Sequence, residues 1–173
     1  MQKNKTEDLV KKAKRKDPDA FSQLMLLYKK DMYRVALAIL MDDEDTADAI
    51  QDTMLTCWEK IHNLRQIEYF KTWMTRILIN KCYDIRRKRE LTISLGEYEE
   101  PAEEDNYNLE LKEALSTLND KYRIILTLFY SEGYHIDEIA RILKLPKSTV
   151  QTRLQRGREN LAKNYYRENE RRK

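Results

Sequence analysis

Apolar residues recur at helical spacing in residues 136–158, where the pattern predicts two short helices joined by a tight turn. The first helix has an apolar face made of Ile136, Ile139, Ala140 and Leu143. Pro146 then interrupts the pattern, and because proline is tolerated in the first turn of a helix, a second helix is expected from about Lys147. Two helices joined in this way are typical of a helix-turn-helix, whose second helix enters the major groove of DNA.

The second helix of this motif has two unlike faces. The arc expected to pack on the preceding helix consists of Val150, Leu154, Gly157 and Leu161. The opposite arc carries amides and hydroxyls flanked by cations, namely Ser148, Gln151, Thr152 and Gln155 with Lys147, Arg156 and Arg158. Amides and hydroxyls can hydrogen-bond base edges and cations suit phosphates, so this arc is a candidate DNA-reading face. The alternative is an ordinary solvated helix face.

The first half of the chain has the pattern of a helical bundle. Asp17 and Pro18 are typical of a helix start, and the apolar stripe that follows is Phe21, Leu24, Met25, Tyr28, Met32, Val35, Ile39 and Leu40. A further helix is expected from about residue 46 to 61, with Ile50, Met54, Trp58 and Ile61 inward and Asp45, Asp48, Gln51 and Asp52 outward. Residues 42–52 hold six carboxylates and no cation, which indicates a docking face for a basic partner.

The segment after residue 69 combines a buried stripe with an unusual outer face. Its expected core residues are Phe70, Trp73, Met74, Ile77, Leu78 and Ile85. The remainder mixes an aromatic, amides, hydroxyls and cations: Tyr69, Lys71, Thr72, Arg76, Asn80, Lys81, Asp84, Arg86 and Arg87. Single-stranded nucleic acid needs such a mixture, because unstacked bases lie on aromatic rings while cations hold the backbone. Tyr69 and Trp73, each taken alone, fit a core position as well.

Composition and charge place these elements in an all-α protein of two small helical domains. Only three glycines and three prolines occur in 173 residues, and 36% of the residues are charged. Residues 71–89 hold seven basic residues and one acidic, and residues 147–173 hold nine and three. Residues 90–105 hold seven acidic residues and no basic one. We therefore expect domains at 1–89 and 109–173 joined by an acidic flexible linker at 90–108.

Several functional classes find no support in the sequence. The longest purely apolar run, residues 35–41, is too short to span a bilayer, and we expect a cytoplasmic protein. Cys57 and Cys82 are expected to be buried free thiols, and neither a metal site nor a cofactor is expected. His62 and His135 lie near no nucleophile motif and are expected at the surface or in turns, so a nucleic-acid-processing enzyme is disfavoured. No small-molecule substrate is expected either.

Over nearly its whole length the chain resembles bacterial sigma factors of the extracytoplasmic-function group, which keep only the second and fourth conserved regions. The segments that carry the resemblance are DAFSQLMLLYKKDMYRVALAIL, DTADAIQDTMLTCWEKI, YFKTWMTRILINKCYDIRRKR, LSTLNDKYRIILTLFY and the helix-turn-helix. The resemblance implies a non-enzymatic factor that binds core RNA polymerase and promoter DNA. It also implies a stress-responsive role and control by a membrane-anchored anti-sigma factor.

The resemblance assigns roles to individual residues. Docking on polymerase is implied for Asp48, Gln51, Asp52, Thr53 and Trp58. Recognition and melting of the minus-10 element are implied for Asn63, Tyr69, Lys71, Thr72, Trp73, Arg76, Asn80, Asp84 and Arg87. Base reading at the minus-35 element is implied for Gln151, Thr152 and Gln155, and phosphate contacts for Lys147, Ser148, Arg153, Arg156 and Arg158. The acidic linker corresponds to the family segment that threads the polymerase interior.

The chain departs from the family pattern in one turn, and one alternative function shares part of the pattern. The family often has Gly in the turn where this chain has Lys144, so a left-handed backbone there would cost about 1 kcal/mol. A free-standing DNA-binding regulator would share the helix-turn-helix, but it would have no use for the acidic face or for the aromatic and cationic segment.

Overall fold

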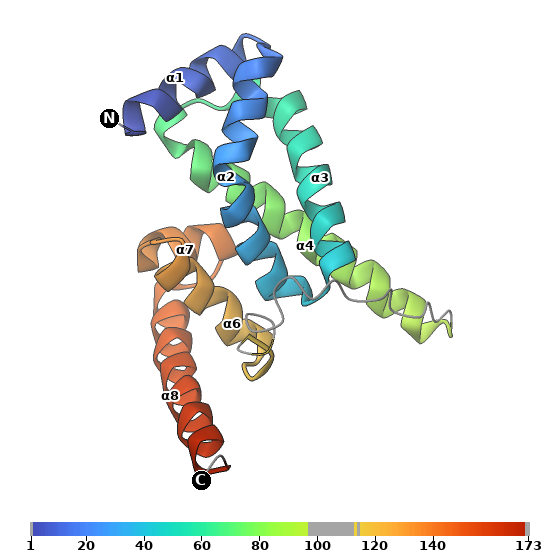
Figure 1. Cartoon of the computed structure of the whole chain (residues 1–173), viewed down its shortest axis with the longest axis vertical. Helices are drawn as coiled ribbons and strands as arrows, with labels where there is room; N and C mark the ends of the chain where they lie inside the picture. The colour runs from blue at the N-terminus through green and yellow to red at the C-terminus, as the bar shows by residue number, and fades with distance from the viewer. Residues whose placement is uncertain (1, 97–112, 114, 172–173) are drawn as a thin grey trace.

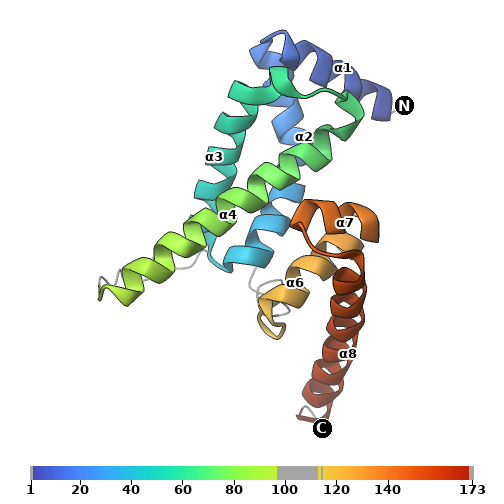
Figure 2. The ribbon, with the colours of Figure 1, turned by 180° about the vertical axis from the view of Figure 1, so that it is seen from behind.

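The structure is a computed structural model that describes residues 2–96, 113 and 115–171, and these residues form helices and short connections (Figures 1 and 2). The N-terminal domain contains α1 (Gln2–Lys14), α2 (Pro18–Leu40), α3 (Asp43–Lys60) and α4 (Phe70–Ser94). The C-terminal domain contains α6 (Asp120–Leu126), α7 (Ile136–Leu143) and α8 (Lys147–Arg171). The all-α class predicted from the sequence is confirmed. Most of the expected linker, residues 97–108, lies outside the described residues.

Helix α2 is the central element of the N-terminal domain, and its start follows the predicted capping pattern. The side chain of Asp17 accepts a hydrogen bond from the backbone N–H of Ala20 at 3.0 Å, and Pro18 occupies the first turn. The helix ends at Met41, which adopts a left-handed conformation with φ 55°. Its buried stripe, including Leu24 and Met32, packs against α1, α3 and α4.

Helix α3 differs from the prediction in its start and in its buried face. It begins at Asp43, three residues earlier than expected, because the side chain of Asp42 caps the backbone N–H of Asp45 at 2.9 Å. Its buried residues are Thr46, Ala49, Thr53 and Cys57, whereas the predicted inward residues Ile50, Met54 and Trp58 are only half-buried. Small side chains therefore occupy the centre of the contact with α2 and α4, and the larger apolar ones flank it.

Helix α4 continues beyond the predicted domain boundary at residue 89 and ends at Ser94. Its buried residues include Phe70, Met74 and Leu78, which belong to the expected stripe, whereas Ile77 and Ile85 are half-buried. Figure 1 shows the C-terminal end of α4 projecting past the other helices of the domain.

The C-terminal domain contains the predicted helix-turn-helix as α7 and α8. Lys144 ends α7 in a left-handed conformation with φ 54° and ψ 45°, and α8 begins at Lys147 as expected. Val150 and Leu154 are buried on α8, but Leu161, predicted inward, is 38% exposed. Gly157 faces α6 rather than the preceding helix, since a Cβ there would lie 3.0 Å from Cδ1 of Leu126.

The two domains contact one another directly. Helix α2 touches α6 and the π-helical turn Thr127–Ser131, and α4 touches α7. Across this boundary Nε of Arg123 donates a 2.5 Å hydrogen bond to the backbone oxygen of Ala38. The sequence pattern predicted two domains joined by a linker, but it did not predict this contact between them.

Candidate nucleic-acid interface

The outer face of α8 presents its amides and hydroxyls to solvent. Gln151, Thr152 and Gln155 are exposed, as the helical periodicity predicted. Thr152 Oγ1 donates a 2.9 Å hydrogen bond to the backbone oxygen of Ser148, and Gln155 Nε2 donates to Glu159 Oε1 at 3.2 Å. Both contacts are local and exposed, so these side chains can exchange them for base edges at little cost.

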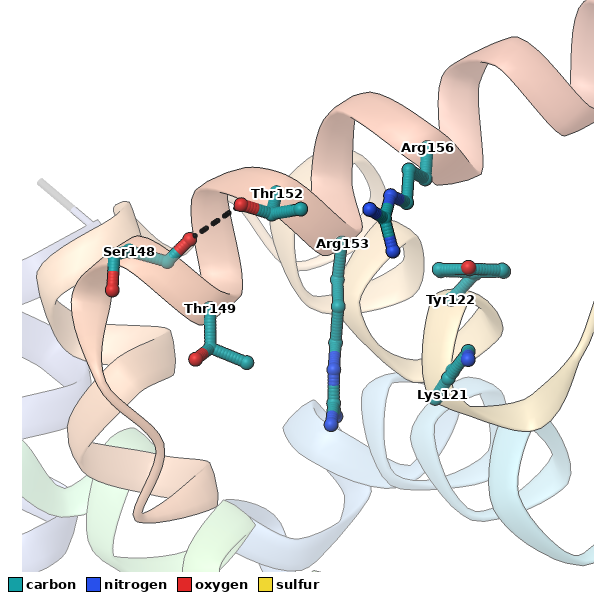
Figure 3. A pocket seen from close by; sticks show the side chains of 7 residues that line it. All are labelled: Lys121, Tyr122, Ser148, Thr149, Thr152, Arg153 and Arg156. Atoms are coloured by element: carbon teal, nitrogen blue, oxygen red, sulfur yellow. Dashed lines mark hydrogen bonds between the residues drawn. The ribbon is translucent and has the colours of Figure 1, made fainter.

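A cavity of about 340 Å³ lies between α6 and the first turns of α8 (Figure 3). We call it the phosphate pocket; its lining residues are Lys121, Tyr122, Ser148, Thr149, Thr152, Arg153 and Arg156. The described lining combines cations with hydroxyl groups and contains no carboxylate. Such a set suits a phosphate oxygen. The sequence had indicated Arg153 and Arg156, but not Lys121, Tyr122 or Thr149, which reach this place through the packing of α6 on α8.

Two other cations predicted to contact phosphates have partners within the domain. Lys147 Nζ lies 2.8 Å from Oδ1 of Asp137, and both side chains are more than half exposed. Arg158 Nε donates a 2.5 Å hydrogen bond to the hydroxyl of Tyr130, and its guanidinium carbon lies 5.6 Å from the centre of that ring. The exposed pair is weak and can open when a phosphate competes. Arg158 is held back against Tyr130 and must turn outward to reach DNA.

The second candidate surface lies along α4 and the turn that precedes it. The exposed members of the predicted minus-10 set are Asn63, Tyr69, Arg76, Asn80, Asp84 and Arg87. Tyr69 is 52% exposed and is available for stacking on a base. Trp73 is half-buried, with its ring centroid 5.9 Å from that of Phe70, so only part of its ring faces solvent. Asp84 forms an ion pair with Arg87 one turn along the helix.

Lys71 and Thr72, which also belong to the predicted minus-10 set, face the C-terminal domain. The ammonium group of Lys71 lies 3.2 Å from Oδ2 of Asp31 and 3.3 Å from Oε2 of Glu132. Thr72 is half-buried on the next position of the helix. The ammonium group of Lys71 is therefore not free to bind a nucleotide in this arrangement.

The acid-rich face of α3 has one part that is paired with an arginine and one part that is exposed to solvent. Asp42 and Asp45 lie 3.7 and 2.7 Å from NH1 of Arg89. Burial and the neighbouring Asp42 nevertheless raise the pKa of Asp45. Asp48 and Asp52 are exposed, and within the described residues no cation forms an ion pair with either.

Two further positions on α3 change the predicted docking set. Thr53 is fully buried, and its hydroxyl donates a 2.6 Å hydrogen bond to the backbone oxygen of Ala49. Its side chain therefore cannot touch a partner, and the structure removes it from the docking face. Leu55, which the sequence analysis did not single out, is 64% exposed. Trp58 is half-buried against Phe21, with ring centroids 5.1 Å apart.

The remaining side chains that could take part in chemistry include two cysteines and two histidines. Cys57 and Cys82 are buried free thiols, as predicted, and burial raises the pKa of each to about 12. His62 and His135 are exposed. Among the described residues there is no cluster of metal-ligating side chains. None of the described helices is long and apolar enough to cross a bilayer.

The fold and these surfaces define a two-domain helical DNA-binding protein. Comparison with known families makes the class specific, because sigma-70 region 2 matches residues 24–92 and sigma-70 region 4 matches residues 108–161. The chain belongs to the sigma-70 family and is a sigma factor of the extracytoplasmic-function type, which directs RNA polymerase to promoters.

Curated relatives and solved structures agree with this assignment. The chain is 29% identical to the ECF RNA polymerase sigma factor SigW of Bacillus subtilis, over 89% of this chain and 93% of the relative. It is 31% identical to RNA polymerase sigma factor SigV of the same organism, over 75% and 81%. Among solved structures, RpoE in complex with the anti-sigma factor NepR from Bartonella quintana matches with a TM-score of 0.68 and 26% identity, covering 83% of this chain and 94% of that chain. CnrH in complex with the cytosolic domain of CnrY has the same fold, with a TM-score of 0.71 and 24% identity, covering 93% and 97%.

Proposed function

We propose that α3 docks this sigma factor on core RNA polymerase through Asp48, Gln51, Asp52 and Leu55, which we call the acidic docking surface. The single observation that carries the proposal is the contrast along one helix. Arg89 forms ion pairs with Asp42 and Asp45, whereas Asp48 and Asp52 stay exposed beside an exposed leucine. Exposed carboxylates next to an exposed apolar side chain fit a partner surface that is basic and has an apolar patch at its centre. Trp58 supports α3 from its half-buried position.

The N-terminal domain reads the minus-10 element in this proposal. Tyr69 and Trp73 offer rings for unstacked bases, while Arg76 and Arg87 hold the backbone of the melted strand. Asn63, Asn80 and Asp84 supply polar groups along the same surface. Extrusion of a base costs a few kcal/mol, which stacking and pocket contacts have to offset.

The C-terminal domain reads the minus-35 element. Gln151, Thr152 and Gln155 face base edges, and the phosphate pocket positions the domain on the backbone through Arg153 and Arg156. Lys121 extends this set of cations on the side of α6. The protein acts in the cytoplasm and performs no catalysis of its own, since its role is to position the polymerase.

An anti-sigma factor is the proposed regulator. The support for this partner is the structural similarity of the chain to RpoE, which was solved in complex with the anti-sigma factor NepR. In the proposal the regulator is membrane-anchored and covers surfaces of both domains until an inducing stress releases it. If the tagged chain is purified from its native host and no such protein co-purifies with it, this part of the proposal is contradicted.

Run-off transcription with purified core polymerase tests the proposed function, with start sites mapped by sequencing.

Asp52→Ala is expected to weaken core binding about tenfold, because it removes an exposed carboxylate from the contact. Asp8→Ala, which removes an exposed carboxylate on α1, is the matched control and should leave core binding unchanged. Equal affinity of the two variants for core would contradict the docking surface. Specific promoter binding by the chain without core would instead favour a free-standing regulator.

A further inference from the structure

The connection between α3 and α4 carries Asn63 and Tyr69, two of the residues proposed to contact the minus-10 element. It consists of two short 3-10 helices, η1 (Ile61–Asn63) and η2 (Ile67–Tyr69), and of the residues between them, and we call it the α3–α4 turn. Its apolar side chains are buried or half-buried, whereas its other side chains are exposed. An exposed turn of this kind meets a base with little loss of entropy only if other contacts already hold its backbone in one conformation.

Helix α1 lies along the α3–α4 turn and touches both of its short helices (Figure 2). Val10 and Ala13 of α1 are fully buried, so this helix is fixed on the domain. At the end of α1, Nζ of Lys14 donates a 2.5 Å hydrogen bond to the backbone oxygen of Leu64. Leu64 has a buried side chain, and its N–H donates to the oxygen of Ile61 at 3.1 Å. Lys14 therefore holds the middle of the turn from a separate helix.

Lys16 holds the point from which the turn departs. Its Nζ donates a 2.5 Å hydrogen bond to the backbone oxygen of Trp58 and lies 4.7 Å from the centre of the Trp58 ring. Trp58 belongs to the last turn of α3, where helix carbonyls generally lack a helical partner and where the helix dipole favours a cation. The two lysines thus contact the backbone at the end of α3 and within the α3–α4 turn.

The backbone of Lys16 is in a conformation that favours glycine. Its φ is 65°, in the left-handed region. The N–H of Lys16 donates to the oxygen of Ala13 at 2.9 Å, and the N–H of Asp17 donates to the oxygen of Lys12 at 3.2 Å. These two bonds form a Schellman ending, in which glycine is the usual residue because a Cβ is strained there. A lysine at such a position suggests a use for its side chain, and the contact with Trp58 provides one.

We propose that Lys14 and Lys16 are positioning residues for minus-10 recognition, which hold the α3–α4 turn in the conformation that presents Asn63 and Tyr69 to the melted strand. The inference rests on the proposed function, in which those two residues contact the minus-10 element. Neither lysine touches DNA in this role, since each acts through the backbone oxygen of another residue. A turn that is already ordered loses less entropy on binding, so these contacts raise the affinity for the melted strand without adding a contact to it.

Hydrogen exchange of the free chain tests the holding of the turn without DNA or polymerase. Lys14→Met keeps the length of the side chain but removes the donor. It is expected to speed exchange of the hydrogen-bonded amides of Leu64 and Tyr69 about fivefold, while the amides of α2 keep their rates. Lys12→Met makes the same change at an exposed residue of α1 and should alter neither. Unchanged exchange in the turn would overturn the proposal, and so would an equal increase throughout the domain.

Binding to a single-stranded minus-10 oligonucleotide, taken from the mapped start sites, tests the role in recognition. With the holoenzyme, Lys14→Met is expected to weaken this binding about fivefold, whereas affinity for a duplex that contains only the minus-35 element and affinity for core stay unchanged. The dependence of oligonucleotide binding on salt concentration should match that of Lys12→Met. Unchanged affinity would overturn the role in recognition. A salt slope smaller in magnitude by about 1 would mean that Lys14 contacts a phosphate directly, and it would overturn the positioning role.

Two variants of Lys16 separate the ammonium group from the strained backbone. Lys16→Gly and Lys16→Ala both remove the ammonium group, but only glycine relieves the strain, so the glycine variant should melt at a higher temperature than the alanine variant. Both are expected to lose about threefold in affinity of the holoenzyme for the minus-10 oligonucleotide. A glycine variant that binds like wild type would overturn the role of the Lys16 ammonium group. Absence of binding by the wild-type holoenzyme would instead count against the proposed function, because hydrogen exchange of the free chain tests the turn independently.

Discussion

Lys144 is the residue at which the helix-turn-helix is most strained. It ends α7 with φ 54° and ψ 45°, and its backbone N–H bonds to the oxygen of Ala140. A side chain in this left-handed region costs about 1–2 kcal/mol, and glycine avoids the cost but loses more entropy on folding. Lys144→Gly is therefore expected to raise the free energy of unfolding by about 0.5–1 kcal/mol. Chemical denaturation measures this change.

The matched control for that change is Lys144→Ala. It removes the exposed lysine side chain but keeps the Cβ and with it the strain. Its stability should equal that of wild type within a few tenths of a kcal/mol. A gain as large as that of the glycine variant would show that the lysine side chain, and not the backbone conformation, is the source of the strain.

Gln155 and Arg156 are neighbours that we expect to act differently on DNA. Gln155→Ala should remove a base contact and alter the preference at one minus-35 position by about 1–3 kcal/mol. Arg156→Ala removes a cation from the phosphate pocket and should weaken binding to all promoters by a similar factor. The slope of the logarithm of the binding constant against the logarithm of the salt concentration should fall in magnitude by about 1. A selection over randomised promoters with the holoenzyme measures both effects. The reverse pattern would mean that the two faces of α8 are assigned the wrong way round.

The sequence predicted individual residues well where one helix decides their exposure. Gln151 and Gln155 are exposed because a period of about 100° per residue places them opposite Val150 and Leu154. It missed Lys121, because that residue joins the phosphate pocket only through the packing of α6 on α8. Patterns within one helix carry no information on such packing.

At the scale of elements, α3 shows why hydrophobic pattern can misplace a face. The large apolar residues Ile50 and Met54 suggested the inward stripe, yet Ala49, Thr53 and Cys57 occupy it. Two neighbouring helices cross close to α3, and small side chains allow that approach, while Thr53 satisfies its hydroxyl on the helix backbone. The existence of α3 was predictable, but its rotation about its own axis depends on its neighbours.

Close approach between helices also determines the role of Gly157. A Cβ at this position would lie 3.0 Å from Cδ1 and 3.2 Å from Cγ of Leu126, a residue that is itself buried. Gly157→Val is therefore expected to push α8 away from α6 and to lower the free energy of unfolding by about 1–3 kcal/mol, despite the better helix propensity of valine. Thermal melting of the chain measures the loss.

Ala162→Val is the control for this element, because residue 162 is exposed on the same helix. It should cost only the difference in helix propensity, a few tenths of a kcal/mol. Weaker minus-35 binding is expected to accompany the loss of stability in Gly157→Val only, since α6 and α8 together line the phosphate pocket. Equal melting of the two variants would mean that Leu126 yields to the added atoms.

At the scale of the whole molecule, segregated charge predicted two domains but not their contact. The contact combines a buried apolar cluster shared by both domains with polar pairs far apart in sequence, such as Arg34 with Glu132 and Thr75 with Tyr134. Charged residues such as Arg34 and Glu132 are expected at the surface from the pattern of hydrophobicity alone. Their pairing appears only when the domains are folded, and for this reason Lys71, predicted to bind the minus-10 element, has its ammonium group in ion pairs between the domains.

The contacts between the domains should differ in strength, and the Arg86–Asp120 pair provides the comparison. NH1 of Arg86 lies 2.9 Å from Oδ2 of Asp120, but the side chains are 35% and 47% exposed. We expect a coupling free energy of at most about 1 kcal/mol from a double-mutant cycle of Arg86→Gln and Asp120→Asn on global unfolding. The cycle cancels the separate role of Asp120 in the first turn of α6. Raising the salt concentration to about 1 M, where the Debye length is about 3 Å, should remove most of the coupling. A coupling well above 2 kcal/mol that survives high salt would show that this pair, and not the buried Glu132, is the main ionic contact holding the domains together.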